Sequence, residues 1–161
     1  MAYIDLQNGK THDFTIMLFA EGTILKPKSF FSLYNHRSYI PIGNAVAKIA
    51  EWEKQGAQIV YCTSRKKRQA QENAKLLLAL GFHGTRLYYR EGRQKYKDII
   101  ETVRPHVLIE DDCKSIGGSW QMCISYVSAD IKRTIRSVVV KEFQGIDALP
   151  DNISEWAHAG N

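Results

Sequence analysis

The sequence has few cysteines and no long hydrophobic run, and each absence excludes a class of protein. Three cysteines in 161 residues are too few, and odd in number, for the disulfide framework of a small secreted domain. No run approaches the roughly 18 apolar residues that a membrane-spanning helix needs. The opening stretch "MAYIDLQNGKTHDF" lacks the basic start and apolar centre of a signal peptide. These absences predict a soluble, cytoplasmic protein with no membrane partner.

Internal repeats, low-complexity segments and interdomain linkers are also missing. Residues 1–161 are therefore expected to form a single domain, large enough to bury about 70% of the surface of the unfolded chain. The composition, with 44% hydrophobic and 24% charged residues, is ordinary for a globular protein. The formal net charge of +5 favours anionic partners, which include phosphorylated small molecules, nucleotides and nucleic acid.

Short apolar segments alternate with amphipathic segments along most of the chain. The apolar segments predict strands at 15–19, 57–62, 86–89, 106–109 and 137–143. The amphipathic segments predict helices at 44–55, 67–80, 93–103 and 130–136. This alternation predicts an α/β fold in three layers, Rossmann-like, with a mainly parallel sheet of about five strands and helices on both faces.

Polar side chains follow four of the predicted strands. Right-handed crossovers bring the carboxyl ends of parallel strands to one edge of the sheet, where ligands bind. The groups expected at that edge are Glu21-Gly22-Thr23, Thr63-Ser64-Arg65, the basic residues that include Lys95 and Lys97, and Glu110-Asp111-Asp112. Adjacent carboxylates repel unless a cation offsets them, and their hard oxygens suit Mg²⁺. Hydroxyls and a lysine beside such an ion form a phosphate-binding constellation.

Four short motifs in this order resemble those of the haloacid-dehalogenase-like (HAD) superfamily of phosphohydrolases. They are "FAEGT", "IVYCTSR", a lysine within "RQKYK", and "VLIEDD". The resemblance covers a core of about residues 14–145 and implies a HAD-like fold with no room for a large cap domain. The segment 26–41 is the candidate for a small lid, with four aromatic side chains available, Phe30, Phe31, Tyr34 and Tyr39. Longer stretches, such as "LYYREGRQKYKDIIE", look like a small group of HAD-like proteins of uncharacterised function.

The first motif departs from the family in two positions. In the family it reads Asp-any-Asp-Gly-Thr, where the first Asp accepts the phosphoryl group and the second is the general acid/base. Here Gly22 and Thr23 match, Glu21 stands at the acid/base position, and Phe19 stands at the position of the nucleophile. Phenylalanine cannot attack phosphorus, and loss of a catalytic nucleophile costs about four to six orders of magnitude in rate.

The other motifs carry over with the family's residue types. The resemblance makes Thr63 the hydroxyl that holds a phosphoryl oxygen, with Ser64 and Arg65 beside it. Either Lys95 or Lys97 would neutralise phosphate charge, since spacing does not choose between them. Mg²⁺ would be held by Asp111 with Asp112, or by Glu110 with Asp111.

The leading interpretation is a HAD-like protein that keeps a Mg²⁺ and phosphate pocket, lacks the usual nucleophile, and binds a phosphorylated ligand or has a regulatory role. One alternative is a Mg²⁺-dependent phosphohydrolase, nucleotidase-like, in which Glu21 or Asp111 activates water. Another is a nucleic-acid-binding protein that uses its basic loops, such as 65–68. A cysteine mechanism is disfavoured: "CTSRKKR" resembles a cysteine-phosphatase loop around Cys62, but it lacks that loop's glycine and its preceding histidine.

Overall fold

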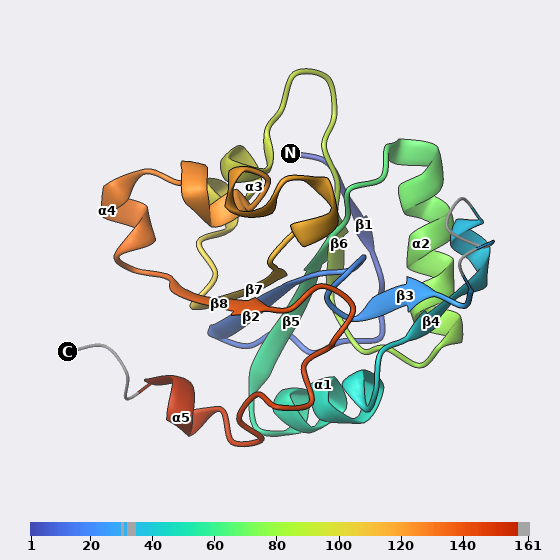
Figure 1. Ribbon diagram of the computed structural model, residues 1–161. Helices are drawn as coiled ribbons and strands as arrows, with labels where there is room; N and C mark the ends of the chain where they lie inside the picture. Colours follow the sequence, from blue (N-terminus) through green and yellow to red (C-terminus); the bar gives the residue numbers. More distant parts are fainter. Residues whose placement is uncertain (30, 32–34, 158–161) are drawn as a thin grey trace.

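The computed structural model describes residues 1–29, 31 and 35–157. It has an α/β fold built on a six-stranded, mainly parallel sheet with the strand order β1-β6-β5-β2-β7-β8 (Figure 1). The edge strand β1 is antiparallel to its neighbour, and the other pairs are parallel. The strands are β1 (Tyr3–Asp5), β2 (Phe14–Phe19), β5 (Ala57–Cys62), β6 (Arg86–Tyr88), β7 (Val107–Asp111) and β8 (Arg136–Val140).

Helices cover both faces of this sheet (Figure 1). One face carries α1 (Ala45–Lys54), α2 (Lys67–Ala79) and α5 (Ser154–Ala157), and the other carries α3 (Tyr96–Val103) and α4 (Ala129–Lys132). Two short strands, β3 (Leu25–Pro27) and β4 (Tyr39–Pro41), pair in a separate small sheet. Short 3₁₀-helices are η2 (His36–Ser38), η3 (Lys114–Ile116), η4 (Gly118–Trp120) and η5 (Cys123–Tyr126).

The protein has one hydrophobic core on each face of the sheet, and successive side chains of β2 point into them alternately. Ile16 and Leu18 face the cluster that includes Trp52 of α1, while Met17 faces the cluster that includes Ile100 of α3. All five of these side chains have no exposed surface, so each contributes roughly 1.5–3 kcal/mol or more through burial. The central strand is therefore fixed on both sides, and its carboxyl end is held at a defined place.

The expected α/β class and the mainly parallel sheet are confirmed, and several bounds differ. The strand predicted at 137–143 ends at Val140, and the helix predicted at 93–103 begins at Tyr96. The sheet has a sixth strand, β1, because three residues with an exposed-intermediate-exposed pattern find an edge in β6. The fourth predicted strand continues through Asp111, so Glu110 and Asp111 lie in β7 and not after it. The last predicted helix ends at Lys132, since Arg136 already begins β8. Among the helices of the described residues, none has the length and apolarity needed to cross a membrane.

Candidate functional site

A cavity of about 400 Å³ lies at the carboxyl ends of β2, β5 and β7, and we name it the sheet-edge cavity. Residues from three of the four motifs line it, which is the convergence expected from parallel strands. From the first motif come Phe19, Glu21 and Gly22, from the second Ser64 and Arg65, and from the acidic motif Glu110 and Asp111. Further lining residues include Tyr39, Arg90, Tyr96, Gln121, Cys123 and Glu142.

The carboxylate of Glu21 is held by several donors at once. Its Oε1 accepts hydrogen bonds from Thr63 Oγ1 at 2.6 Å and from Asn73 Nδ2 at 2.6 Å. Its Oε2 accepts from the Ser64 backbone N–H at 3.2 Å. Arg65 Nε lies 3.7 Å from Oε1 and forms an ion pair with it. Both oxygens of Glu21, and the hydroxyl of Thr63, are therefore already engaged within the protein.

Asp111 lies against the first motif. Its Oδ1 accepts a hydrogen bond from Thr23 Oγ1 at 3.2 Å, and its Oδ2 accepts from the Cys113 backbone N–H at 3.0 Å. Gly22 has a φ of +83°, and a Cβ built there would lie 2.7 Å from Asp111 Oδ1. Glycine is thus required at this position both for its backbone conformation and for the close approach of the carboxylate.

Glu110 points to the other face of the sheet, as alternation along a strand dictates. It is only 3% exposed, and its two oxygens accept hydrogen bonds from the backbone N–H groups of Cys123 at 2.7 Å and Ile124 at 3.0 Å. Burial raises the pKa of this carboxyl, and the two backbone donors oppose the rise. Glu110 therefore anchors the start of η5 against the sheet.

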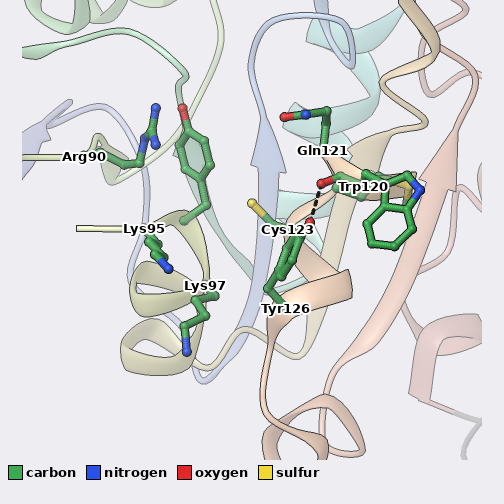
Figure 2. A pocket seen from close by; sticks show the side chains of 9 residues that line it. Arg90, Lys95, Lys97, Trp120, Gln121, Cys123 and Tyr126 are labelled. Atoms are coloured by element: carbon green, nitrogen blue, oxygen red, sulfur yellow. Dashed lines mark hydrogen bonds between the residues drawn. The ribbon is translucent and has the colours of Figure 1, made fainter. Parts of the chain in front are cut away.

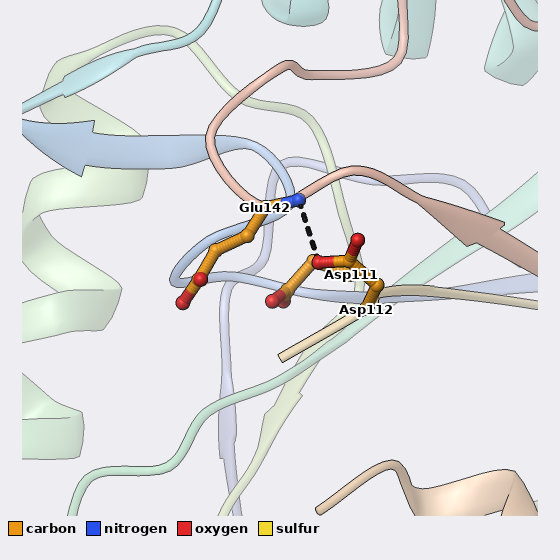
Figure 3. Close-up of side chains that lie close together, drawn as sticks. All are labelled: Asp111, Asp112 and Glu142. Carbon is orange, nitrogen blue, oxygen red and sulfur yellow. Dashed lines mark hydrogen bonds between the residues drawn. The ribbon is translucent and has the colours of Figure 1, made fainter. Parts of the chain in front are cut away.

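Three carboxylates gather at the ends of β7 and β8 (Figure 3). Oxygens of Asp111, Asp112 and Glu142 all lie within 4.8 Å of one another, so these residues could hold a metal ion. Asp112 Oδ1 accepts from the Glu142 backbone N–H at 3.1 Å, and Glu142 accepts from Ser115 Oγ at 2.6 Å. Burial raises the pKa of Asp111, with a smaller contribution in the same direction from the charge of Glu142.

Cationic side chains also line the cavity. Arg65 and Arg90 both line it, and the Arg90 guanidinium lies 4.2 Å from the centre of the Tyr96 ring. Over the described ranges, Arg90 forms no ion pair with a carboxylate. Lys95 and Lys97, the lysines named by the third motif, line a neighbouring pocket and not this cavity. Arg90 is therefore the cation of that segment that reaches the site.

Aromatic side chains form the rest of the wall. Phe19 is half-buried, and its ring meets that of Tyr96 edge to face, with centroids 5.5 Å apart. From the candidate lid, Tyr39 is buried and lines the cavity, while Phe31 is 95% exposed. Phe30 and Tyr34 lie outside the described residues.

Cys62 does not have the surroundings of a nucleophile. It lies at the end of β5 with no exposed surface, and burial is the largest cause that raises the pKa of its thiol well above the usual range. The neighbouring charge of Glu21 acts in the same direction. A catalytic cysteine needs the opposite, a lowered pKa and access to substrate.

The burial and raised pKa of the cysteine thiols predict how they react in the native protein. A raised pKa means that the thiolate forms only at higher pH, so we expect Cys62 and the buried Cys123 to resist Ellman's reagent at pH 7.5. Half-buried Cys113, whose pKa is raised to about 12, should react on the order of 100-fold more slowly than a free thiol. All three should react at ordinary rates in denaturant. Fast labelling of Cys62 in the native protein would contradict this account.

Sequence reasoning missed two residues of the site. Asn73 lies on the face of α2 that also carries Ala70, Ala74 and Leu77, and it is buried there with its amide on Glu21. A polar residue within an apolar helical face was the signal. Glu142 follows β8 at the same sheet edge as the acidic motif, but the predicted strand 137–143 included it. A strand that ended at Val140 would have placed Glu142 among the polar groups that follow strands.

Comparison of the chain with family models, with curated protein sequences and with solved structures gave no significant match. The candidate site therefore stands on its own geometry.

Proposed function

We propose that this protein binds a phosphorylated small molecule together with Mg²⁺ in the sheet-edge cavity, without forming a phosphoenzyme. The observation that carries the proposal is the division of the cavity wall. Arg65 and Arg90 follow β5 and β6, on one side of β2 in the sheet, whereas Asp111 and Glu142 lie at the ends of β7 and β8, on the other side. A phosphate group is an anion that both parts can accept when a cation bridges it to the carboxylates.

The guanidinium groups suit the phosphate. Arg65 is paired with Glu21 only at 3.7 Å, and its buried Nε has no hydrogen-bond partner among the described residues. Arg90 is held over Tyr96 without a carboxylate partner there. Guanidinium groups bind phosphate oxygens through charge-assisted, often bidentate hydrogen bonds. The two arginines thus offer positive charge that the protein itself leaves partly unused.

The acidic cluster fits Mg²⁺ by its donor set. Its ligands are hard carboxylate oxygens, and two oxygens on opposite sides of one Mg²⁺ ion lie about 4.2 Å apart, close to the spread of this cluster. Asp111 and Glu142 line the cavity, so they would hold the ion where it meets the ligand. A bound Mg²⁺ would supply charge neutralisation for the phosphate.

The same cavity lacks the groups that turnover by the HAD route requires. The ring of Phe19 lies where the resemblance expects an aspartate, and it lines the cavity in edge-to-face contact with Tyr96. Glu21, at the acid/base position, has both oxygens occupied by Thr63, Asn73 and Ser64. These contacts favour binding over phosphoryl transfer.

Substitution of Arg90 tests the proposed binding of a phosphorylated ligand. Replacing Arg90 with alanine should weaken binding of ribose 5-phosphate, in the presence of Mg²⁺, by roughly 10- to 100-fold, because a charge-assisted hydrogen bond contributes about 1.5–3 kcal/mol. Arg93→Ala is the matched control, since Arg93 is exposed on the same segment and does not line the cavity. Isothermal titration calorimetry measures both affinities.

Two results would contradict the proposal. Equal affinities of the Arg90→Ala and Arg93→Ala variants for ribose 5-phosphate would show that the phosphate does not bind in this cavity. Sustained Mg²⁺-dependent hydrolysis across a panel of phosphate esters, lost in Asp111→Ala, would favour the hydrolase alternative instead.

A further inference from the structure

A second pocket, of about 500 Å³, lies next to the sheet-edge cavity, and we name it the basic-aromatic pocket. Arg90, Lys95 and Lys97 form one wall, and Trp120 and Tyr126 lie across from them on the segment that follows β7 (Figure 2). The two cavities share four lining residues, which are Arg90, Tyr96, Gln121 and Cys123. A single ligand can therefore extend from one cavity into the other.

We propose that the basic-aromatic pocket holds the base of a nucleotide whose phosphate lies in the sheet-edge cavity. This inference rests on the proposed function and adds to it the class of ligand. It is carried by three observations: an exposed aromatic wall, cations without acidic partners, and the shared lining of the two cavities.

The aromatic wall is exposed but ordered. Trp120 is 76% exposed, whereas the other two tryptophans, Trp52 and Trp156, are 0% and 5% exposed. Over the described part of the chain, the indole of Trp120 has no aromatic partner. The backbone that carries it is held, because the Tyr126 hydroxyl donates to the Trp120 carbonyl at 2.7 Å and the Ser125 hydroxyl donates to the Ser119 carbonyl at 2.7 Å. An exposed ring on a backbone held in this way suits stacking of a planar base.

The basic wall supplies charge for phosphate. Within the described residues, neither Lys95 nor Lys97 forms an ion pair, and Arg90 contacts the ring of Tyr96. Basic groups beside aromatic rings are the arrangement that binds bases and phosphates together. Gln121, at the junction of the two cavities, brings an amide that can donate to and accept from polar edges of a ligand.

The dimensions favour one nucleotide over a strand. Volumes of about 500 and 400 Å³ fall within the range of small-ligand clefts. The base would occupy the first pocket and the phosphate the second, with Arg90 between them. Lys95 and Lys97 would then attract the ligand and contact any additional phosphate groups.

Calorimetry with AMP and ribose 5-phosphate, both with Mg²⁺, separates the base from the phosphate. We expect AMP to bind at least tenfold more tightly than ribose 5-phosphate and to protect Trp120 from acrylamide quenching, since Trp120 is the exposed tryptophan. Trp120→Ala should lower the AMP affinity roughly tenfold and leave that of ribose 5-phosphate unchanged. Tyr3→Ala, an exposed aromatic residue that lines neither cavity, is the control and should bind both ligands normally.

The outcomes separate this inference from the proposed function. Binding of ribose 5-phosphate with no tighter binding of AMP would overturn the base pocket and leave the proposed function standing. Failure of both ligands to bind would overturn both. If an adenylate hexamer binds more than tenfold more tightly than AMP, with steep salt dependence, the ligand is single-stranded nucleic acid and not one nucleotide, and the inference is overturned. Lys95→Ala should weaken AMP binding more than Lys75→Ala, the control on the exposed face of α2. That result, together with tighter binding of AMP than of ribose 5-phosphate, supports the inference.

Discussion

Replacing Glu21 with alanine is expected to lower the free energy of unfolding by about 3–5 kcal/mol, a large part of the stability of a domain of this size. The side chain of Glu21 is only 15% exposed, and it accepts hydrogen bonds from Thr63, Ser64 and Asn73. Its removal leaves the buried hydroxyl of Thr63 without its acceptor and the buried amide of Asn73 with one acceptor, Thr63 Oγ1. Each unsatisfied buried group costs about 1–3 kcal/mol.

Urea unfolding followed by circular dichroism measures this effect, and two variants make it specific. Glu21→Gln should lower the free energy of unfolding by an intermediate amount. Its amide keeps one acceptor oxygen, but its NH₂ group then points towards other hydrogen-bond donors. Glu51→Ala, on the exposed face of α1, should change stability by less than about 0.5 kcal/mol, since its ion pair with Lys54 is solvent-exposed. Equal losses for Glu21→Ala and Glu51→Ala would show that the network around Glu21 contributes little.

This structural role changes the interpretation of the first motif. In the sequence, Glu21 stands where the resemblance expects an acid/base, and its chemistry alone would permit that role. In the structure, its carboxylate joins the end of β2 to the loop after β5 and to the middle of α2. A residue that links three segments in this way can be essential for the shape of the cavity without exchanging a proton with a ligand.

The parts of the fold that the sequence predicts are those whose pattern is local. Strand β2 and helix α2 carry their apolar periodicities within six and thirteen residues, and their bounds agree closely with expectation. Strand β1 could not be predicted in the same way, because its three residues become a strand only through pairing with β6, more than 80 residues later. The extent of β7 was underestimated because its last two residues are acidic, and only their hydrogen-bond partners make their burial tolerable.

In the candidate site, too, some features follow from local sequence patterns and others depend on contacts distant in sequence. The rule that ligands bind at the carboxyl ends of parallel strands brought Glu21, Arg65 and Asp111 to one edge, and they line one cavity. The rule does not say how far a loop projects. The segment after β6 directs Arg90 into the cavity, whereas Lys95 and Lys97, at the beginning of α3, line the neighbouring pocket. Loop conformation, which depends on contacts distant in sequence, decided between these cations.

The second large effect concerns the acidic cluster. If Mg²⁺ binds there with a dissociation constant of about 1 mM, then 10 mM Mg²⁺ should raise the free energy of unfolding by about 1.4 kcal/mol. Asp111→Asn should abolish this gain, because it removes the charge of the buried ligand of the cluster. Glu142→Gln should reduce it, and Asp13→Asn, at an exposed carboxylate outside the cluster, should leave it intact. Urea unfolding with and without Mg²⁺ gives each difference directly.

The pH dependence of this gain provides an independent check with a defined sign. Burial raises the pKa of Asp111 above its ordinary value of 3.8, so without Mg²⁺ the folded state retains a proton that the unfolded state has lost. The contribution of Asp111 to stability is then present below pH 3.8 and is lost as the pH rises through the raised pKa. Mg²⁺ needs the ionised carboxylate, so its stabilising effect must change in the opposite direction and grow with pH over the same range. A Mg²⁺ effect that is constant across that range, or one that persists in Asp111→Asn, would place the ion elsewhere on the protein.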